Sequence, residues 1–203
     1  MKLPFPLEYE IGVARDLVDR DYDQEGGIVV GQMGSRVKLG TLSHIGIVVK
    51  DMDRAMKYYG SVFGLGPFTT NVYELKGFMY RGQPANARVK AGIAYSGRIF
   101  IELIEVLEGE TAHTEFLRKK GEGVQHIAFT VENLDEALAE LAKDGIQPTM
   151  RYNLILERPS RPEAEQPSGA TKRRFEVKEA YLDSEGVGGT VIQLMQIRQL
   201  ETD

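Results

Sequence analysis

Two stretches of the chain, His44-Ile45-Gly46-Ile47-Val48-Val49 and His126-Ile127-Ala128-Phe129-Thr130-Val131, repeat one pattern and decide the fold. The offset between them is 82 residues (126 − 44 = 82), and it continues without a gap into the similar segments 51–56 and 133–138. Each stretch is rich in apolar and β-branched residues, as strands are, and each is followed by a helix start. The chain is therefore expected to contain two copies of one unit.

A second pair of matching segments lies downstream. Ile101-Glu102-Leu103-Ile104 resembles Ile192-Gln193-Leu194-Met195 at an offset of 91 residues (193 − 102 = 91), so the second copy carries a net insertion. We place this insertion between residues 156 and 171, where Arg158-Pro159-Ser160-Arg161-Pro162 and Gln166-Pro167-Ser168-Gly169 are not expected to pair in a sheet. The sequence thus predicts a mobile loop over 157–171, either a cover for an active site or plain disorder.

The predicted order of elements is a strand, a helix and several strands, twice over. In the first copy a strand at 42–49 leads to a helix that runs from an N-cap at Asp51 to Gly64, and in the second a strand at 124–131 leads to a helix from Asn133 to Gly145. Further strands are expected at 67–75, 77–82, 88–95 and 98–106, with a connecting helix at 111–120. We assign residues 1–40 to an N-terminal extension, a helix plus an arm, and 41–203 to one domain with module one at 41–107, a linker helix at 108–121 and module two at 122–203.

Composition limits the classes of partner. The 203 residues are 42% hydrophobic, enough for one shared core, and the formal charge of −5 with a pI near 5.4 argues against a nucleic-acid partner. No cysteine is present, so a metal would be held by nitrogen and oxygen. No apolar run approaches the roughly 20 residues that span a bilayer, and the start lacks a signal-peptide core. We expect a cytoplasmic protein with a small-molecule substrate and no nucleic-acid or membrane partner.

Four polar residues stand at equivalent places in the repeat: His44 with His126, and Glu102 with Gln193. Each lies in an otherwise apolar strand. Burying an uncompensated carboxylate there costs on the order of several kcal/mol, even after relaxation of the surroundings. If the modules pair about a pseudo-twofold axis, these positions converge on one centre. Two imidazoles, a carboxylate and an amide oxygen form a set for one divalent metal ion, which could be Zn, Co, Ni, Mn or Fe.

Other polar residues are assigned to the surface. His113 has no partner in the repeat and is predicted to be exposed. Asp19, Asp21 and Asp23 resemble the start of a calcium loop, but Gln24 stands where that loop needs glycine, so we interpret them as a solvated turn.

These residues also carry a resemblance to a known family. Over residues 41–198 the chain resembles the vicinal oxygen chelate superfamily, which includes glyoxalase I, methylmalonyl-CoA epimerase, extradiol dioxygenases and bleomycin-resistance proteins. The segment Phe116-Leu117-Arg118-Lys119-Lys120-Gly121-Glu122-Gly123-Val124-Gln125-His126-Ile127-Ala128-Phe129 is most similar to the epimerase branch. The resemblance implies an α+β fold in which two tandem βαβββ modules form a curved mixed sheet around a central metal site. It maps the metal ligands onto His44, Glu102, His126 and Gln193.

The chain also departs from that family pattern. Epimerases of this type carry His, Gln, His and Glu in that order, so Gln and Glu are interchanged here, and glyoxalase I differs at the last position alone. Gln193 cannot serve as a base, which leaves Glu102 as the expected catalytic residue, acting by loosening from the metal, with a hydroxide on the metal as the alternative base. The resemblance thus implies a metal-dependent isomerase, epimerase or lyase that removes a proton next to a carbonyl of a small, acyl-CoA or thiol-conjugated, substrate.

Two alternatives and several details stay open at this stage. An Fe(II)-dependent extradiol-type dioxygenase could use His44, His126 and Glu102, and a non-catalytic binding protein would sequester a ligand without a metal. A homodimer is the default expectation for oligomeric state. Two sets of residues are further candidates for the site. Tyr80, Arg81, Tyr95, Arg151 and Tyr152 could line the pocket, and Lys172-Arg173-Arg174 either meets phosphates or is simply solvated.

Overall fold

The βαβββ order expected from the repeat is present in both halves of the chain. A computed structural model describes residues 35–159, 172–186 and 188–200, so the helix expected within 1–40 and most of the loop at 157–171 lie outside the described residues. The first half contains β1 (Leu42–Val48), α2 (Met52–Phe63), β2 (Thr69–Tyr80), β3 (Gln83–Ser96) and β4 (Ile99–Gly109). After α3 (Ala112–Lys120), the second half contains β5 (Gly123–Thr130), α4 (Leu134–Ala142), β6 (Pro148–Pro159), β7 (Lys172–Leu182) and β8 (Val191–Leu200).

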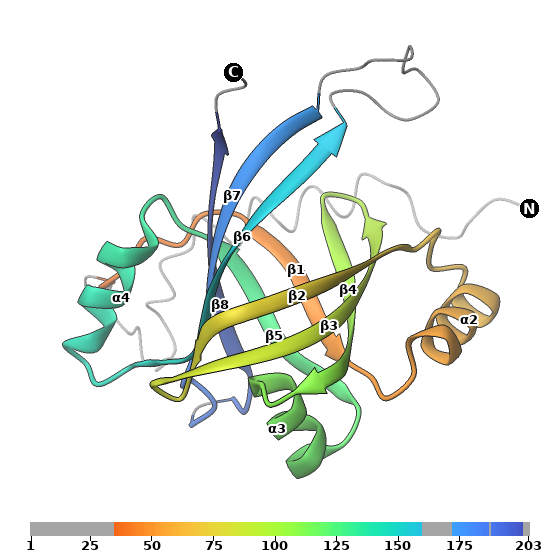
Figure 1. Ribbon diagram of the computed structural model, residues 1–203, viewed down its shortest axis with the longest axis horizontal. Coiled ribbons are helices and arrows are strands. Elements are labelled where there is room, and N and C mark those ends of the chain that lie inside the picture. Colours follow the sequence, from red (N-terminus) through yellow and green to blue (C-terminus); the bar gives the residue numbers. More distant parts are fainter. Residues whose placement is uncertain (1–34, 160–171, 187, 201–203) are drawn as a thin grey trace, which may run out of the picture. The chain divides into compact units, whose positions relative to one another are not determined.

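The eight strands form one closed sheet in the order β1-β4-β3-β2-β6-β7-β8-β5 (Figure 1). Within each half the first and last strands pair in parallel, β1 with β4 and β5 with β8. The halves join at two antiparallel seams, β1 with β5 and β2 with β6. The two modules therefore pair within one chain, and the interior is enclosed without a partner subunit.

The register of β1 against β5 defines a local twofold axis. Ile45 faces Ile127, its own equivalent in the repeat, and on either side His44 faces Ala128 while Gly46 faces His126. A twofold axis between Ile45 and Ile127 exchanges these two pairs. The pseudosymmetry inferred from the repeat is thus present in the hydrogen-bonded register.

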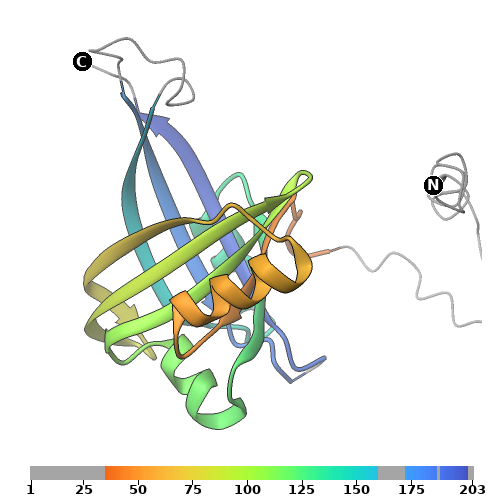
Figure 2. The same ribbon diagram turned by 90° about the vertical axis from the view of Figure 1, so that its right-hand side faces the viewer.

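Helices α2 and α4 cover equivalent parts of the outer surface. Figure 2 shows α2 lying across the strands of the first half, and it packs on β3 and β4 through Met52, while α4 packs on β7 and β8 through Leu134. Both helices begin where the sequence predicts, because the side chains of Asp51 and Asn133 accept hydrogen bonds from backbone N–H groups of the first turn. Among the described residues, no helix is long and apolar enough to cross a lipid bilayer.

Two details differ from the expectation. The strands expected at 67–75 and 77–82 are one strand, β2, in which Gly77 adopts a φ of 62° at a bulge between Leu75 and Phe78. The prediction that Arg158 and Pro159 do not pair is wrong. They are the last residues of β6 and pair with β7, because a proline is tolerated at the end of a strand.

Candidate metal centre and cavity

Four neighbouring strands place the predicted site residues in two rows. In the first row Glu102 on β4 and His126 on β5 flank Gly46 on β1. In the second row His44 on β1 and Gln193 on β8 flank Ala128 on β5. Each row has a small residue at its middle, which leaves room for the long side chains on both sides. Successive side chains of a strand point to opposite faces, whereas partners on neighbouring strands point to the same face. All four side chains therefore point to the inner face of the sheet.

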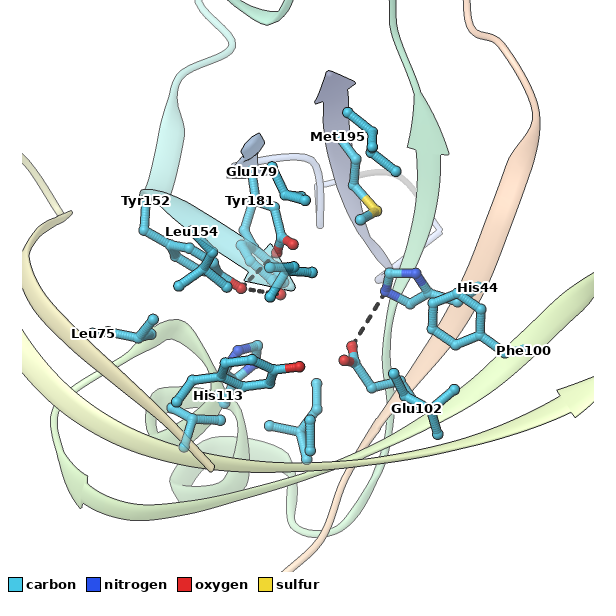
Figure 3. A pocket seen from close by; sticks show the side chains of 18 of the residues that line it. His44, Leu75, Phe100, Glu102, His113, Tyr152, Leu154, Glu179, Tyr181 and Met195 are labelled. Carbon is cyan, nitrogen blue, oxygen red and sulfur yellow. Dashed lines mark hydrogen bonds and ion pairs between the residues drawn. The ribbon is translucent and has the colours of Figure 1, made fainter. Parts of the chain in front are cut away.

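Three of these side chains converge on one point. Nε2 of His44 lies 3.2 Å from Nε2 of His126 and 3.3 Å from Oε2 of Glu102, which is 3.8 Å from Nε2 of His126. Both imidazoles are buried, and Glu102 keeps 17% of its side chain exposed to the cavity (Figure 3). This His-Glu-His group could hold a metal ion. Two nitrogens bonded to one ion at about 2.1 Å lie about 3.0–3.4 Å apart, which matches the separation of the two imidazoles.

The fourth predicted residue, Gln193, has an unused acceptor. Its Nε2 donates a hydrogen bond of 2.8 Å to Glu179, and its Oε1 is buried without a hydrogen-bond partner among the described residues. A buried amide oxygen is costly to leave unpaired, so an orphaned one calls for a missing partner. The amide of Gln193 also contributes to the raised pKa of His44, so the two side chains are neighbours. A cation held by the two histidines and Glu102 would satisfy this oxygen.

The protonation of the two imidazoles differs. Burial lowers the pKa of His44, but the hydrogen bond and charge of Glu102 outweigh burial and raise that pKa above its usual value. Burial, followed by the charge of His44, holds the pKa of His126 well below its usual value. His126 is therefore neutral near pH 7, whereas Glu102 favours a proton on His44. A divalent cation would replace this proton, because all the atoms that converge here are acceptors once it is removed.

The cluster opens into a cavity of about 140 Å³ enclosed by the sheet. Its polar lining consists of two carboxylates, two imidazoles and three phenols, and the rest of its wall is apolar. The polar lining residues are His44, Tyr73, Glu102, His113, Tyr152, Glu179 and Tyr181. No lysine or arginine lines this cavity among the described residues. Pockets for drug-sized ligands usually measure about 300–1,000 Å³, so this one fits only a small group.

Glu179 is a functional candidate that the sequence analysis missed. It lies on β7, and Figure 3 shows its side chain entering the cavity beside Tyr152, away from Glu102. Its Oε2 accepts hydrogen bonds from the hydroxyl of Tyr152 at 2.5 Å and from Nε2 of Gln193 at 2.8 Å. Burial raises the pKa of Glu179 to about 7, against a smaller lowering by the Tyr152 hydrogen bond. A carboxyl group of this kind can either accept or donate a proton near neutral pH.

The prediction that His113 is a surface residue is wrong. His113 stands in the first turn of α3 and is 2% exposed, and its ring lines the cavity. The sequence carries a signal for this position, because Ala112, His113 and Phe116 form the buried face of α3 at helical spacing. The absence of a repeat partner is therefore no sign of exposure.

Of the other pocket residues that the sequence suggested, Tyr152 alone lines the cavity. Tyr80 and Arg81 instead bind Glu115 on α3, and Arg151 binds Asp135. Tyr95 is 64% exposed. Within the basic run, Arg173 and Arg174 are exposed at the start of β7 and do not line the cavity.

Comparisons with known proteins agree with this geometry. Residues 43–155 match the model of the Glyoxalase/Bleomycin resistance protein/Dioxygenase superfamily, which is more than half of the chain. The chain belongs to this superfamily. The resemblance seen in the sequence is thereby confirmed, as is the α+β fold with its closed mixed sheet.

Three relatives illustrate the range of similarity. An uncharacterized protein of Bacillus subtilis, YqjC, is 31% identical over 56% of this chain and 74% of its own length. The mitochondrial methylmalonyl-CoA epimerase of Mus musculus is 29% identical over 54% of this chain, which spans 56% of that enzyme. The crystal structure of methylmalonyl-CoA epimerase from Mycobacterium tuberculosis aligns with 81% of this chain and 93% of its own, at 21% identity and a TM-score of 0.46.

Gly46 is predicted to be essential for the cluster. A Cβ at this position would overlap the ring of His126, so Gly46→Ala must displace that imidazole. We expect a loss of about 1–3 kcal/mol in the free energy of unfolding, together with loss of metal from purified protein. Chemical denaturation and elemental analysis measure the two effects.

Gly92→Ala is the matched control for this variant. It also adds a methyl group to a strand, and the new Cβ would lie 2.8 Å from Sδ of Met52, under α2 and outside the cluster. We expect a comparable loss of stability with an unchanged metal content. Full metal content in Gly46→Ala would contradict the geometry of the cluster.

The raised pKa of Glu179 predicts a pH-dependent stability of the metal-free protein. Between the ordinary carboxyl pKa near 4.5 and the folded value of about 7, the folded state keeps a proton that the unfolded state has lost. Stability should therefore fall as pH rises through this window, by about 3 kcal/mol, and Glu179 should cause no further change above it. Glu179→Gln should abolish most of this decline in denaturation curves between about pH 5 and about pH 8. Glu176→Gln is the control on the same strand as Glu179, where the carboxylate of Glu176 binds Arg198 on β8, and this variant should keep the decline.

Proposed function

We propose that this protein is a divalent-metal-dependent epimerase or isomerase that moves the proton next to a carbonyl group of a small acyl substrate. The observation that carries the proposal is a pair of carboxyl groups on opposite sides of one cavity. Glu102 comes from β4 and Glu179 from β7, two strands that stand four places apart in the closed order of eight. With an acid or base on each side, a proton can leave one face of a planar carbon while another arrives at the opposite face.

The metal would be held by His44, His126 and Glu102, with Oε1 of Gln193 as the fourth ligand. Both imidazoles present Nε2 to the common point, and the unpaired amide oxygen of Gln193 supports its inclusion. When bound, a divalent ion supplies Lewis-acid polarisation of the substrate carbonyl, which lowers the cost of removing the neighbouring proton. Zn, Co, Ni, Mn and Fe all accept this donor set.

The two carboxyl groups have different duties in this proposal. Glu102 keeps part of its side chain open to the cavity and would take the substrate proton. Glu179, with its pKa of about 7, returns a proton to the opposite face and is positioned for this by Tyr152 and Gln193.

The volume of the cavity limits the substrate. About 140 Å³ admits a small acyl or carbonyl group, so a carrier such as coenzyme A would remain outside. The related epimerases act, by their name, on methylmalonyl-CoA. The acyl group of such a thioester is small enough for a cavity of this volume. A cytoplasmic location and a homodimer belong to the proposal as well.

Ring cleavage by Fe(II) is the second candidate function. It is favoured by one observation, the grouping of two histidines with one carboxylate beside the cavity, which is also the ligand set of Fe(II) oxygenases. Glu179 has no evident duty in that reaction. Oxygen uptake with catechol by iron-loaded protein separates the two functions.

The proposed ligands predict the metal content. Purified protein should carry about one equivalent of a divalent metal, and the His44→Ala, His126→Ala double variant should carry none, as measured by elemental analysis. His113→Phe, which changes a buried histidine outside the ligand set, is the control and should keep its metal. Wild-type protein that stays metal-free after reconstitution would instead support the binding-protein alternative.

The two carboxyl groups predict different defects in proton exchange. Metal-loaded protein is incubated in heavy water with each epimer of methylmalonyl-CoA, and deuterium uptake and epimer conversion are followed separately by NMR. Glu102→Gln should lose at least about 100-fold in both. Glu179→Gln should lose conversion by a similar factor but keep deuterium uptake into the epimer whose proton faces Glu102. Equal loss of uptake from both epimers in Glu179→Gln would contradict the assignment of one carboxyl group to each face.

A further inference from the structure

Gln125 joins two histidines through a single oxygen atom. Its Oε1 lies 2.8 Å from Nδ1 of His113 and 3.0 Å from Nδ1 of His126. All three side chains are buried, with Gln125 1% exposed. Gln125 immediately precedes His126 on β5, and His113 reaches it from the first turn of α3.

The orientation of this amide is fixed from its other side. Nε2 of Gln125 donates a hydrogen bond of 2.9 Å to the backbone carbonyl of Ala112. A carbonyl oxygen can only accept, so the NH₂ end of the amide must point to Ala112 and Oε1 must point to the two rings. Oε1 is itself only an acceptor. Both imidazoles must therefore donate to it, which requires a proton on Nδ1 of His113 and on Nδ1 of His126.

The tautomer with a proton on Nδ1 has a different consequence in His126 and in His113. In a neutral imidazole with a proton on Nδ1, the lone pair is on Nε2. His126 then presents an unprotonated Nε2 to His44 and Glu102. His113 presents an unprotonated Nε2 as well, on a ring that lines the cavity. Burial lowers the pKa of both imidazoles, so both remain neutral near pH 7.

A neutral acceptor in this wall distinguishes substrates. Near this ring, Tyr181 meets His113 edge-on, and the hydroxyl of Tyr152 is used by Glu179. A hydroxyl or amide N–H of the substrate would satisfy Nε2, whereas a methyl group of the same size would leave a buried acceptor unpaired. Such a mismatch costs about tenfold or more in binding.

We propose that Gln125 sets the tautomers of both His126 and His113, so that His126 is ready to bind the metal and His113 selects substrates with a hydrogen-bond donor. Gln125 is a positioning residue and His113 a specificity-determining residue in this scheme. The chemical class of substrate is a small acyl or oxo compound that carries a hydroxyl or amide N–H. The metal and substrate parts rest on the proposed function, and the tautomer part does not.

The tautomers can be read directly in metal-free protein. The chain has three histidines, so long-range proton–nitrogen NMR spectra of protein labelled with nitrogen-15 in its imidazoles can be assigned with His44→Ala and His113→Phe. Both His113 and His126 should carry the proton on Nδ1. Gln125→Met, which keeps the side-chain length but lacks the acceptor, should shift both toward mixed tautomers. A proton on Nε2 of either ring in the wild-type protein would overturn the proposal.

Metal affinity tests the role of Gln125 toward His126. Titration with Zn²⁺ should show about 10- to 100-fold weaker binding in Gln125→Met, because loss of the partner of a ligating imidazole has costs of this size. His113→Phe should bind Zn²⁺ within a few-fold of wild type. Equal affinity in Gln125→Met and wild type, with both proteins folded by circular dichroism, would refute the positioning role.

Isosteric probes test the role of His113. Hydroxypyruvate and 2-oxobutanoate chelate a metal through the same two oxygens and differ only in a hydroxyl for a methyl group. The pair 4-hydroxy-2-oxobutanoate and 2-oxopentanoate places that difference one carbon further away. Calorimetry on Zn²⁺-loaded wild type should show a preference of about tenfold or more for the hydroxyl compound in at least one pair. His113→Phe should lose it, and if that variant does not fold, His113→Leu takes its place.

The outcomes separate the two proposals. Absence of a preference in both pairs, with Zn²⁺ bound, refutes the selection by His113 and leaves the proposed epimerase function standing. A preference that persists in His113→Phe refutes it equally. Protein that binds no Zn²⁺ refutes the proposed function, and the tautomer assignment is then still decided by the spectra of metal-free protein.

Discussion

The site depends on the antiparallel pairing of β1 with β5 at Ile45 and Ile127. This pairing is the seam between the two modules and fixes the twofold relation between them. A slip of one residue would turn the inner side chains of one strand outward, because side chains of a strand alternate between faces. The seam also brings Gly46 opposite His126, where any side chain would overlap the imidazole. The pairing that closes the sheet therefore also brings together the cluster of His44, Glu102 and His126.

The site contains few charged groups, and each of them has a defined environment. The cavity wall is mostly apolar, so each ionisable group in it requires a partner or a shifted pKa. Glu102 lies with two imidazoles, and Glu179 accepts a phenol and an amide while burial raises its pKa to about 7. Gln125 gives His113 and His126 a common acceptor. The polar groups thus form short chains. We assign ligands to Oε1 of Gln193, which has no hydrogen-bond partner among the described residues, and to Nε2 of His113.

The sequence predicted the parts of the site that the repeat duplicates. His44 and His126 share one offset, and Glu102 and Gln193 the other, so their convergence followed from pairing the modules. Glu179 was not predicted as a site residue, because its counterpart in the first module is a small apolar residue. A comparison of the two copies therefore does not indicate it. The alternation along β7 did contain the signal, since Phe175, Val177 and Tyr181 stand at every second position around Glu179 and face inward.

Other features depend on contacts between segments that are distant in sequence. His113 was assigned to the surface because it has no partner in the repeat, although the helical spacing of Ala112, His113 and Phe116 indicates a buried face. Its contact with Gln125 on β5 joins segments that the sequence does not pair. Two strands were predicted where the structure has the single strand β2, because the sequence does not show the bulge. At this bulge a glycine with positive φ lets strand pairing continue on both sides. Strand ends and residue partners of this kind are set by tertiary packing, which overrides local preference.

The interchange of Gln and Glu relative to the epimerase pattern has a physical explanation in Glu179. Register places Glu179 opposite Met195 on β8 and Ala91 opposite Ile104 on β4, so Ala91 is the counterpart of Glu179 in the first module. Each module therefore supplies one carboxyl group to the cavity. A glutamate at position 193 would put a second carboxylate within hydrogen-bond distance of Glu179, and like charges so close raise the cost of ionising both.

An amide at position 193 avoids that repulsion. Its NH₂ group donates to Glu179, and its oxygen remains free to face the centre formed by His44, His126 and Glu102. The carboxylate of the ligand set then has to come from the other module, at Glu102, where the neighbouring wall is neutral at Ala91. The interchange therefore preserves the charge of the proposed ligand set, and it leaves the second carboxyl group on β7 with a pKa of about 7.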